Sequence, residues 1–193
     1  MQRRAWLLAS AAVLLVTATG CEQRAQFNNV DITGAQYARE FVLTDHAGAR
    51  RTLADYKGKV VTVFFGFVQC PDICPTTLQD MAEVRRRLGR AGDDVQVLFI
   101  TVDPDRDTRE VLAKYVPAFD PSFVGLYGSP EDTARVAKEF KVIYEKVPGQ
   151  TPTSYTINHS AGTYVFDRQG RVRLFLRHGA GIDAIAADLK RLL

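Results

Sequence analysis

The sequence has little of three features that would each identify a class of protein. It contains only three cysteines and three histidines in 193 residues, which excludes a disulfide-rich scaffold. Residues 1–20 hold two of the 25 basic residues and none of the 22 acidic ones, so the remainder is nearly neutral. Because nucleic-acid binding depends on clustered positive charge, we expect no nucleic-acid partner. Hydrophobic residues make up 46% of the chain, which is enough for an ordinary core.

A long apolar run is also missing at the N-terminus. The run from Ala5 to Ala18 is shorter than the roughly 20 residues that a membrane helix needs. It follows Arg3 and Arg4 and ends just before Cys21, which is the order of a lipoprotein export signal, although leucine is more usual at position 18. We therefore expect residues 1–20 to be a signal peptide of lipoprotein type; a retained membrane anchor is the alternative.

This layout predicts where the protein works. A lipid on Cys21 would hold the chain on the cell membrane, facing the periplasm or another extracytoplasmic space. Residues 21–36 are polar and lack periodicity, so we expect a membrane-proximal tether. Residues 37–193 then form one domain, whose two remaining cysteines face an oxidising compartment. A thiol pair there is either a disulfide or is kept reduced for a purpose.

The apolar patterns predict alternating strands and helices. Residues 59–67 and 95–102 are runs of β-branched, aromatic and aliphatic residues, as in buried central strands, with a helical pattern between them. In chain order we expect an N-terminal hairpin at 41–53, a helix capped by Asp107 at 105–116 and a short strand at 123–128. A helix capped by Ser129 at 129–140, an extended segment at 141–147, a hairpin at 162–176 and a final helix at 182–193 follow. This order predicts a thioredoxin-like α/β fold: a central mixed sheet flanked by helices, with an N-terminal β-hairpin and insertions.

Cys70 and Cys74 follow the first buried strand, at the end of the sheet where open α/β folds place their sites. Pro75 and the helical pattern after it indicate a helix start near Cys74, and helix starts favour thiolates. One helical turn separates the two Cα atoms by roughly 6 Å, at ~1.5 Å per residue. That distance suits a disulfide and also lets both sulfurs reach one ion. The spacing therefore leaves a redox pair, a structural disulfide and a metal site open.

His159 directly precedes the late hairpin. If the strand at 162–166 runs antiparallel to the buried strands, His159 lies at the same end of the sheet as the cysteines. Two thiolates and one imidazole would make a three-coordinate soft site of the kind that selects Cu(I), whereas structural zinc needs a fourth ligand. A loop histidine is more often a plain solvent-facing residue, which is what we expect of His46 and His178.

Three blocks of sequence together resemble the Sco/SenC family: "GFVQCPDICPTTL", "TVDPDRDT" and "INHSAGTYVFD". The resemblance covers about residues 38–193. It implies a membrane-tethered copper protein of thioredoxin fold that helps to assemble the CuA centre of cytochrome c oxidase. Position by position, it implies that Cys70, Cys74 and His159 are copper ligands and that Asp103 lies near them.

The chain departs from the family pattern at two positions. Many members have a histidine where this chain has Gln69, and an aspartate where it has Asn158. Neither departure removes a ligand. A carboxylate missing beside His159 would alter the orientation of the imidazole ring and the charge near it.

We therefore expect a copper metallochaperone rather than an enzyme. Cys70, Cys74 and His159 would hold copper, with Cu(I) favoured and Cu(II) possible, received from an upstream donor and passed to the copper-bearing subunit of a terminal oxidase. Residues 37–193 would be its copper-binding domain.

The main alternative is a membrane-tethered thiol-disulfide oxidoreductase. In it Cys70 and Cys74 would be a redox-active pair, served by an upstream thiol reductant, that reduces cysteines of the oxidase subunit. Thioredoxin-type reductases have two residues between the cysteines and a proline before the late strand, whereas this chain has three residues and no proline at 157–164. A peroxiredoxin-like peroxidase would need a single activated cysteine. A structural disulfide would leave the reactive helix start unused.

Overall fold

The computed structural model describes residues 26–151 and 154–193, so the expected signal peptide at 1–20 and Cys21 lie outside the described residues. The strands are β1 Val30–Asp31, β2 Val42–Asp45, β3 Arg50–Thr52, β4 Val60–Gly66, β5 Val95–Thr101, β6 Val124–Tyr127, β7 Tyr144–Pro148, β8 Tyr155–His159, β9 Thr163–Phe166 and β10 Val172–Leu176. The α-helices are α1 Ile73–Leu88, α2 Arg109–Tyr115, α3 Pro130–Glu139 and α4 Ile182–Leu192. Short 3-10 turns are η1 Leu53–Tyr56, η2 Gly89–Asp94 and η3 Val116–Ala118.

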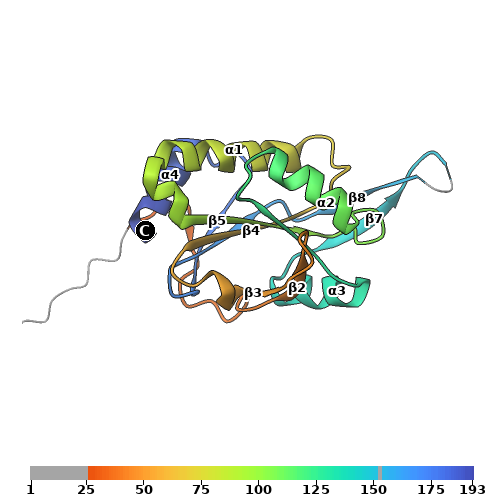
Figure 1. The fold of residues 1–193 in the computed structure, drawn as a ribbon, viewed down its shortest axis with the longest axis horizontal. Coiled ribbons are helices and arrows are strands. Elements are labelled where there is room, and N and C mark those ends of the chain that lie inside the picture. Colours follow the sequence, from red (N-terminus) through yellow and green to blue (C-terminus); the bar gives the residue numbers. More distant parts are fainter. Residues whose placement is uncertain (1–25, 152–153) are drawn as a thin grey trace, which may run out of the picture.

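A central mixed sheet organises the chain, as the sequence predicts. Its strand order is β1-β10-β9-β4-β5-β6-β2-β3. The strands β4, β5 and β6 are parallel, and β9 pairs with β4 in the antiparallel direction. The start of β9 therefore lies at the same end of the sheet as the carboxyl end of β4. Helices α1 and α4 lie together over one face, while α3 covers the other face near β2 (Figure 1).

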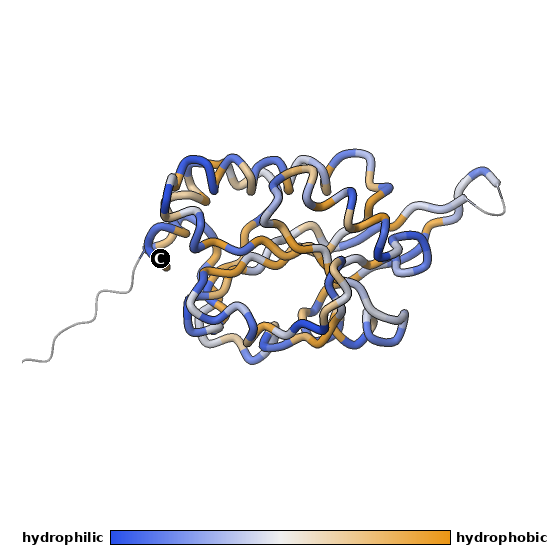
Figure 2. Tube along the Cα trace, viewed as in Figure 1, coloured by the Kyte–Doolittle hydropathy of each residue, from blue (hydrophilic) through white to orange (hydrophobic). Residues whose placement is uncertain are grey.

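The two runs of β-branched, aromatic and aliphatic residues form the centre of this sheet. Every residue of β4 and of β5 is buried, which requires cover on both faces. Apolar residues follow these strands while the outer surfaces of the helices are hydrophilic (Figure 2). The thioredoxin-like fold is thus confirmed, with the N-terminal hairpin of β2 and β3 added at one edge.

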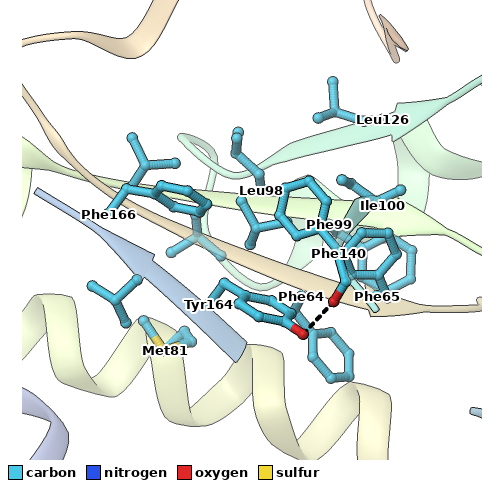
Figure 3. Close-up of a cluster of buried hydrophobic side chains, with 14 of the residues drawn as sticks. Phe64, Phe65, Met81, Leu98, Phe99, Ile100, Leu126, Phe140, Tyr164 and Phe166 are labelled. Atoms are coloured by element: carbon cyan, nitrogen blue, oxygen red, sulfur yellow. Dashed lines mark hydrogen bonds between the residues drawn. The ribbon is translucent and has the colours of Figure 1, made fainter. Parts of the chain in front are cut away.

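Aromatic side chains fill the core beneath the sheet. Phe140 contacts Phe65 and Tyr164 with ring centroids 5.1 and 5.3 Å apart. The Tyr164 hydroxyl donates a hydrogen bond to the Phe140 carbonyl, which satisfies the one polar atom of that ring (Figure 3). Leu78 and Met81 of α1 are fully buried on the other face of β4. The end of β4 is therefore held rigidly by packing on both sides.

Two expected helix and strand details differ in the structure. The chain between 155 and 159, not expected as a strand, is β8, and it pairs with β7 in a separate two-stranded sheet. The expected cap Asp107 does not cap α2; the neighbouring Thr108 does, by accepting from the Val111 N–H at 3.4 Å. Ser129 caps α3 as expected, accepting from the Asp132 N–H at 3.1 Å.

The folded domain begins earlier than the predicted boundary at residue 37. Val30 and Asp31 pair with β10 as strand β1, inside the segment expected to be a tether. Before this strand, Asn28 and Asn29 each donate through both the backbone N–H and the side-chain amide to the carboxylate of Asp188, at 2.8–2.9 Å. A two-residue strand is too short to show periodicity, so sequence reading missed it.

In the part of the chain that the structure describes, no helix has the length and apolar character needed to cross a membrane.

Replacing Asp188 with alanine should destabilise the domain. Asp188 is fully buried, and its loss would leave four N–H donors without their charged acceptor. We expect Asp188→Ala to lower the free energy of unfolding by about 2–3 kcal/mol, as measured by urea denaturation. The matched control is Asp183→Ala on the same helix, where the side chain is 87% exposed and its ion pair should contribute at most about 1 kcal/mol. Equal effects of the two substitutions would contradict the role given to Asp188.

Candidate metal centre

The loop that joins β4 to α1 carries both cysteines. β4 ends at Gly66 and α1 begins at Ile73, one residue before Cys74, which confirms the predicted helix start. Within the loop, the Cys70 N–H donates to the Phe67 carbonyl at 3.2 Å. The two cysteines therefore lie at the carboxyl end of a central parallel strand, where the twisted sheet leaves room for a site.

Asp107 ties this loop to the neighbouring strand. Its carboxylate oxygen Oδ2 accepts from the Val68 N–H at 2.9 Å and from the Thr101 hydroxyl at 2.6 Å. Burial raises the pKa of Asp107 above its ordinary value, and these two hydrogen bonds oppose the rise. Sequence reading took this residue for a helix cap because Asp107 and Thr108 can both cap, and the sequence does not show which one turns inward.

The sulfur of Cys74 is packed against the last residue of β4. A Cβ at Gly66 would lie 2.8 Å from Cys74 Sγ and 2.8 Å from a carbon of the Phe99 ring, so only glycine fits there. Burial is the main cause that raises the pKa of the Cys74 thiol, and a hydrogen bond with Cys70 adds to it. Cys74 is therefore a thiol at neutral pH, and burial outweighs the helix start that was expected to favour a thiolate. The Cys74 N–H instead donates to Cys70 Sγ at 3.4 Å, so the N–H group at the start of α1 interacts with the sulfur of Cys70 and not with that of Cys74.

His159 is the last residue of β8, and its ring reaches the cysteines. Nε2 lies 3.5 Å from Cys74 Sγ, and Nδ1 lies 3.0 Å from the Ser160 carbonyl. Because a carbonyl only accepts, Nδ1 carries the proton and Nε2 of the neutral ring presents its lone pair to the sulfur. Phe64 and Phe67 contact the ring at centroid distances of 6.1 and 5.8 Å. Burial lowers the pKa of His159, which keeps the ring neutral.

Cys70, Cys74 and His159 thus form one cluster. One ligand atom from each lies within 4.8 Å of the other two, and both cysteines are free thiols. The sequence placed these three residues at the same end of the sheet, and the structure brings them together. Two sulfurs and an imidazole nitrogen at this separation could hold a metal ion.

Asp103 lies beside the cluster but does not join it. Its carboxylate is fully buried, pairs with Arg106 and accepts from the Tyr155 hydroxyl at 2.7 Å. The Arg106 guanidinium also donates to the Gln69 side chain at 2.9 Å. Gln69, which stands where many family members have a histidine, is therefore a partner of Arg106. Arg106 stands in the second sequence block, but neither it nor Tyr155 was predicted as a site residue, because their roles depend on contacts between distant segments.

The remaining candidate residues lie away from the cluster. His178 is exposed, as expected, but His46 is half-buried and its Nδ1 accepts from the Gly125 N–H at 3.0 Å, so it is a structural acceptor and not a solvent-facing residue. Asn158 is exposed, because side chains alternate along β8 and Asn158 faces away from the side of His159. A carboxylate at Asn158 would not contact the imidazole, whose Nδ1 is held by Ser160 instead.

The fold and the cluster define a thioredoxin-like protein with a two-cysteine, one-histidine site. The chain belongs to the SCO1/SenC family, whose family model matches residues 30–193. It is 37% identical over 154 residues to the bovine protein SCO2 homolog, mitochondrial; the match covers 79% of this chain and 58% of the bovine protein.

Solved structures of Sco proteins are also similar to this chain. The Bradyrhizobium japonicum ScoI structure, which has copper bound, is 41% identical with a TM-score of 0.73, covering 80% of this chain and 98% of that one. The Thermus thermophilus apo Sco1 structure is 38% identical with a TM-score of 0.77, covering 87% and 98%. The family resemblance read from the three sequence blocks is therefore confirmed.

Gly66→Ala tests the close approach at the end of β4. The added methyl group would displace the Cys74 sulfur and the Phe99 ring, and overpacking of this kind costs about 1–3 kcal/mol of folding free energy. Urea denaturation should show that loss. In a Cys74→Ala background the same substitution should cost less, because the displaced sulfur is gone. An identical cost in both backgrounds would show that the contact with Cys74 is unimportant.

Proposed function

We propose that this protein is a copper metallochaperone, with Cys70, Cys74 and His159 as the ligands of its cargo. It receives copper from an upstream donor and delivers it to the copper-bearing subunit, the CuA centre, of cytochrome c oxidase. The main support for this proposal is that two sulfurs and one imidazole nitrogen lie within 4.8 Å of one another. The copper-bound state of the similar Bradyrhizobium protein supports copper as the cargo.

The donor set favours Cu(I). Two thiolates are soft ligands that select Cu(I), and a neutral imidazole suits copper as a third ligand. Cys74 is fully buried, so it would anchor the ion, while Cys70 and His159 are half-buried. A thiolate of an acceptor protein can approach from the open side and replace one of these two ligands. Such stepwise ligand exchange moves the ion without releasing it to water.

Titration of the reduced protein with Cu(I) against a competing chelator tests the site. We expect one copper per chain, abolished by Cys70→Ser and by Cys74→Ser, because one sulfur cannot replace two. His159→Ala should weaken Cu(I) binding by about tenfold or more. The control His178→Ala changes an exposed histidine and should leave the affinity unchanged. Absence of binding to the reduced protein, or equal effects of the two histidine variants, would contradict the proposal.

Copper binding should release protons. Cys74 is protonated in the metal-free protein because burial raises the pKa of its thiol, and the ligand form is the thiolate. His159 releases none at neutral pH, since its pKa is lowered. The apparent affinity should therefore rise with pH, by about tenfold per pH unit for each proton released. Calorimetry in two buffers of different ionisation enthalpy counts these protons, and a count of zero at pH 7 would contradict a thiol at Cys74.

A second candidate function is reduction of disulfides in the oxidase subunit. It is favoured by the free thiols at Cys70 and Cys74 and by the N–H of Cys74 that faces the Cys70 sulfur. This activity does not need His159. Trapping of a mixed disulfide with the oxidase subunit by Cys74→Ser, unaffected by His159→Ala, would favour the reductase over the metallochaperone.

We also propose that residues 1–20 are removed and that a lipid on Cys21 anchors the protein on the outer side of the cell membrane. The supporting observation is the order of basic, apolar and small residues before Cys21. From Cys21 to Asn28, the first residue that is hydrogen-bonded to Asp188, an extended chain would reach about 25 Å at ~3.5 Å per residue, which keeps the domain near a membrane-bound acceptor. Mass spectrometry of the mature N-terminus tests this; an unmodified Cys21 in membrane-extracted protein would contradict it.

A further inference from the structure

His159 belongs to an arm that is separate from the main sheet. The arm consists of β7 and β8, which pair only with each other in the described residues and project from the domain (Figure 1). An isolated two-stranded hairpin is at best marginally stable in water. Ile157 is the buried apolar residue of the arm, but hydrophobic contact is non-directional and does not by itself orient the arm. Phe64 and Phe67 pack against the imidazole, and its position then depends on the polar contacts that attach the arm to the domain.

The loop between β5 and α2 provides such polar contacts. Arg106 donates through Nη1 to the carbonyl of Tyr155 at 2.8 Å, and its guanidinium carbon lies 3.6 Å from the centroid of the Tyr155 ring. The same Nη1 donates to Gln69, the residue before Cys70, at 2.9 Å. Arg106 thus touches the strand that carries His159 and the loop that carries Cys70. We call Gln69, Asp103, Arg106 and Tyr155 the Arg106 clasp.

The clasp is anchored in the interior of the protein. Asp103 is fully buried, pairs with Arg106 and accepts from the Tyr155 hydroxyl at 2.7 Å. A hydrogen-bonded pair with a buried carboxylate costs much more to break than an exposed pair. Arg106 also lies 6.0 Å from the centroid of the Phe67 ring, which in turn contacts the His159 ring. The guanidinium therefore supports the imidazole both through the strand and through Phe67.

We propose that Arg106 is a positioning residue, which holds the arm so that His159 Nε2 meets the two cysteine sulfurs. This proposal rests on the proposed copper function for its effect on copper affinity, and on the contacts of Arg106 for its mechanism. Two thiolates supply most of the binding free energy for Cu(I), with the imidazole as a weaker third ligand, whereas Cu(II) prefers nitrogen and oxygen ligands and depends more strongly on the imidazole. The clasp therefore controls how strongly the site binds Cu(II) relative to Cu(I). It also gives a role to the "DPDR" part of the second sequence block, which the ligands themselves do not explain.

Three substitutions in the full chain separate the possible roles of Arg106. Arg106→Met removes the charge and the hydrogen bonds while keeping an unbranched apolar stem. Arg106→Lys keeps the charge but loses the planar fork that reaches Gln69, Tyr155 and Asp103 together. The control Asp105→Asn removes an exposed ion pair between the same loop and the same arm, where Lys146 Nζ lies 2.5 Å from Asp105, and keeps the contact of Lys146 with the Tyr155 ring.

The first measurement is hydrogen exchange of the metal-free protein. In Arg106→Met and Arg106→Lys, the amides of β8 should exchange at least about tenfold faster while those of β4 and β5 keep their protection, because only the arm is released. Asp105→Asn should leave the exchange of β8 unchanged. Urea denaturation checks that each variant is folded. If Arg106→Met fails to fold because Asp103 is left unpaired, the double variant with Asp103→Asn removes both charges and is measured instead.

The second measurement compares copper affinities in two backgrounds. With His159 present, Arg106→Met should weaken Cu(II) binding by about 10–100-fold and reduce the intensity of its charge-transfer absorption, while Cu(I) affinity falls by less than about threefold. With His159→Ala already present, Arg106→Met should change neither affinity, because it acts through that imidazole.

Unchanged exchange in β8, full rescue by Arg106→Lys, or an equal loss of Cu(II) affinity with and without His159 would each overturn the proposal. If the unsubstituted protein binds no copper, the proposed function fails, and the exchange data alone still decide whether Arg106 holds the arm.

Discussion

The contact between the Cys74 sulfur and Gly66 is the constraint on which the site depends. Because Gly66 has no Cβ, the first turn of α1 can approach the end of β4 and place the sulfur in the core. From there the Cys74 N–H reaches Cys70 Sγ, and the sulfur faces His159 Nε2. A side chain at Gly66 would displace the Cys74 sulfur, so that Cys70 Sγ and His159 Nε2 would no longer both lie next to Cys74.

The surrounding residues complete an arrangement that suits the proposed binding and release of a copper ion. Asp107 joins the cysteine loop to β5, and Arg106 joins the same loop to the arm. Cys74 is thus buried in a rigid core, while His159 lies on the arm of β7 and β8, which Arg106 attaches to the domain. This division suits a carrier, because a carrier needs one ligand that retains the ion and others that an acceptor can replace.

Much of this arrangement follows from the sequence, and the rest follows from contacts between distant segments. Two buried strands, the helix start at Cys74 and the placement of His159 at the same end of the sheet were predicted from local patterns and topology, and the structure agrees. The strand β8 was not predicted, because its residues are mixed in polarity and it is held by Arg106 from another loop. The early domain start was missed for a similar reason, since β1 has two residues and its flank is held by Asp188, about 160 residues away.

The central claim is that two sulfurs and one imidazole nitrogen bind the same copper ion, and X-ray absorption at the copper edge tests it most directly. The reduced protein loaded with one Cu(I) should show two sulfur scatterers and one nitrogen scatterer, and the nitrogen signal with its imidazole multiple scattering should vanish in His159→Ala. A spectrum with sulfur alone in the unsubstituted protein, or one unchanged by loss of His159, would contradict the account.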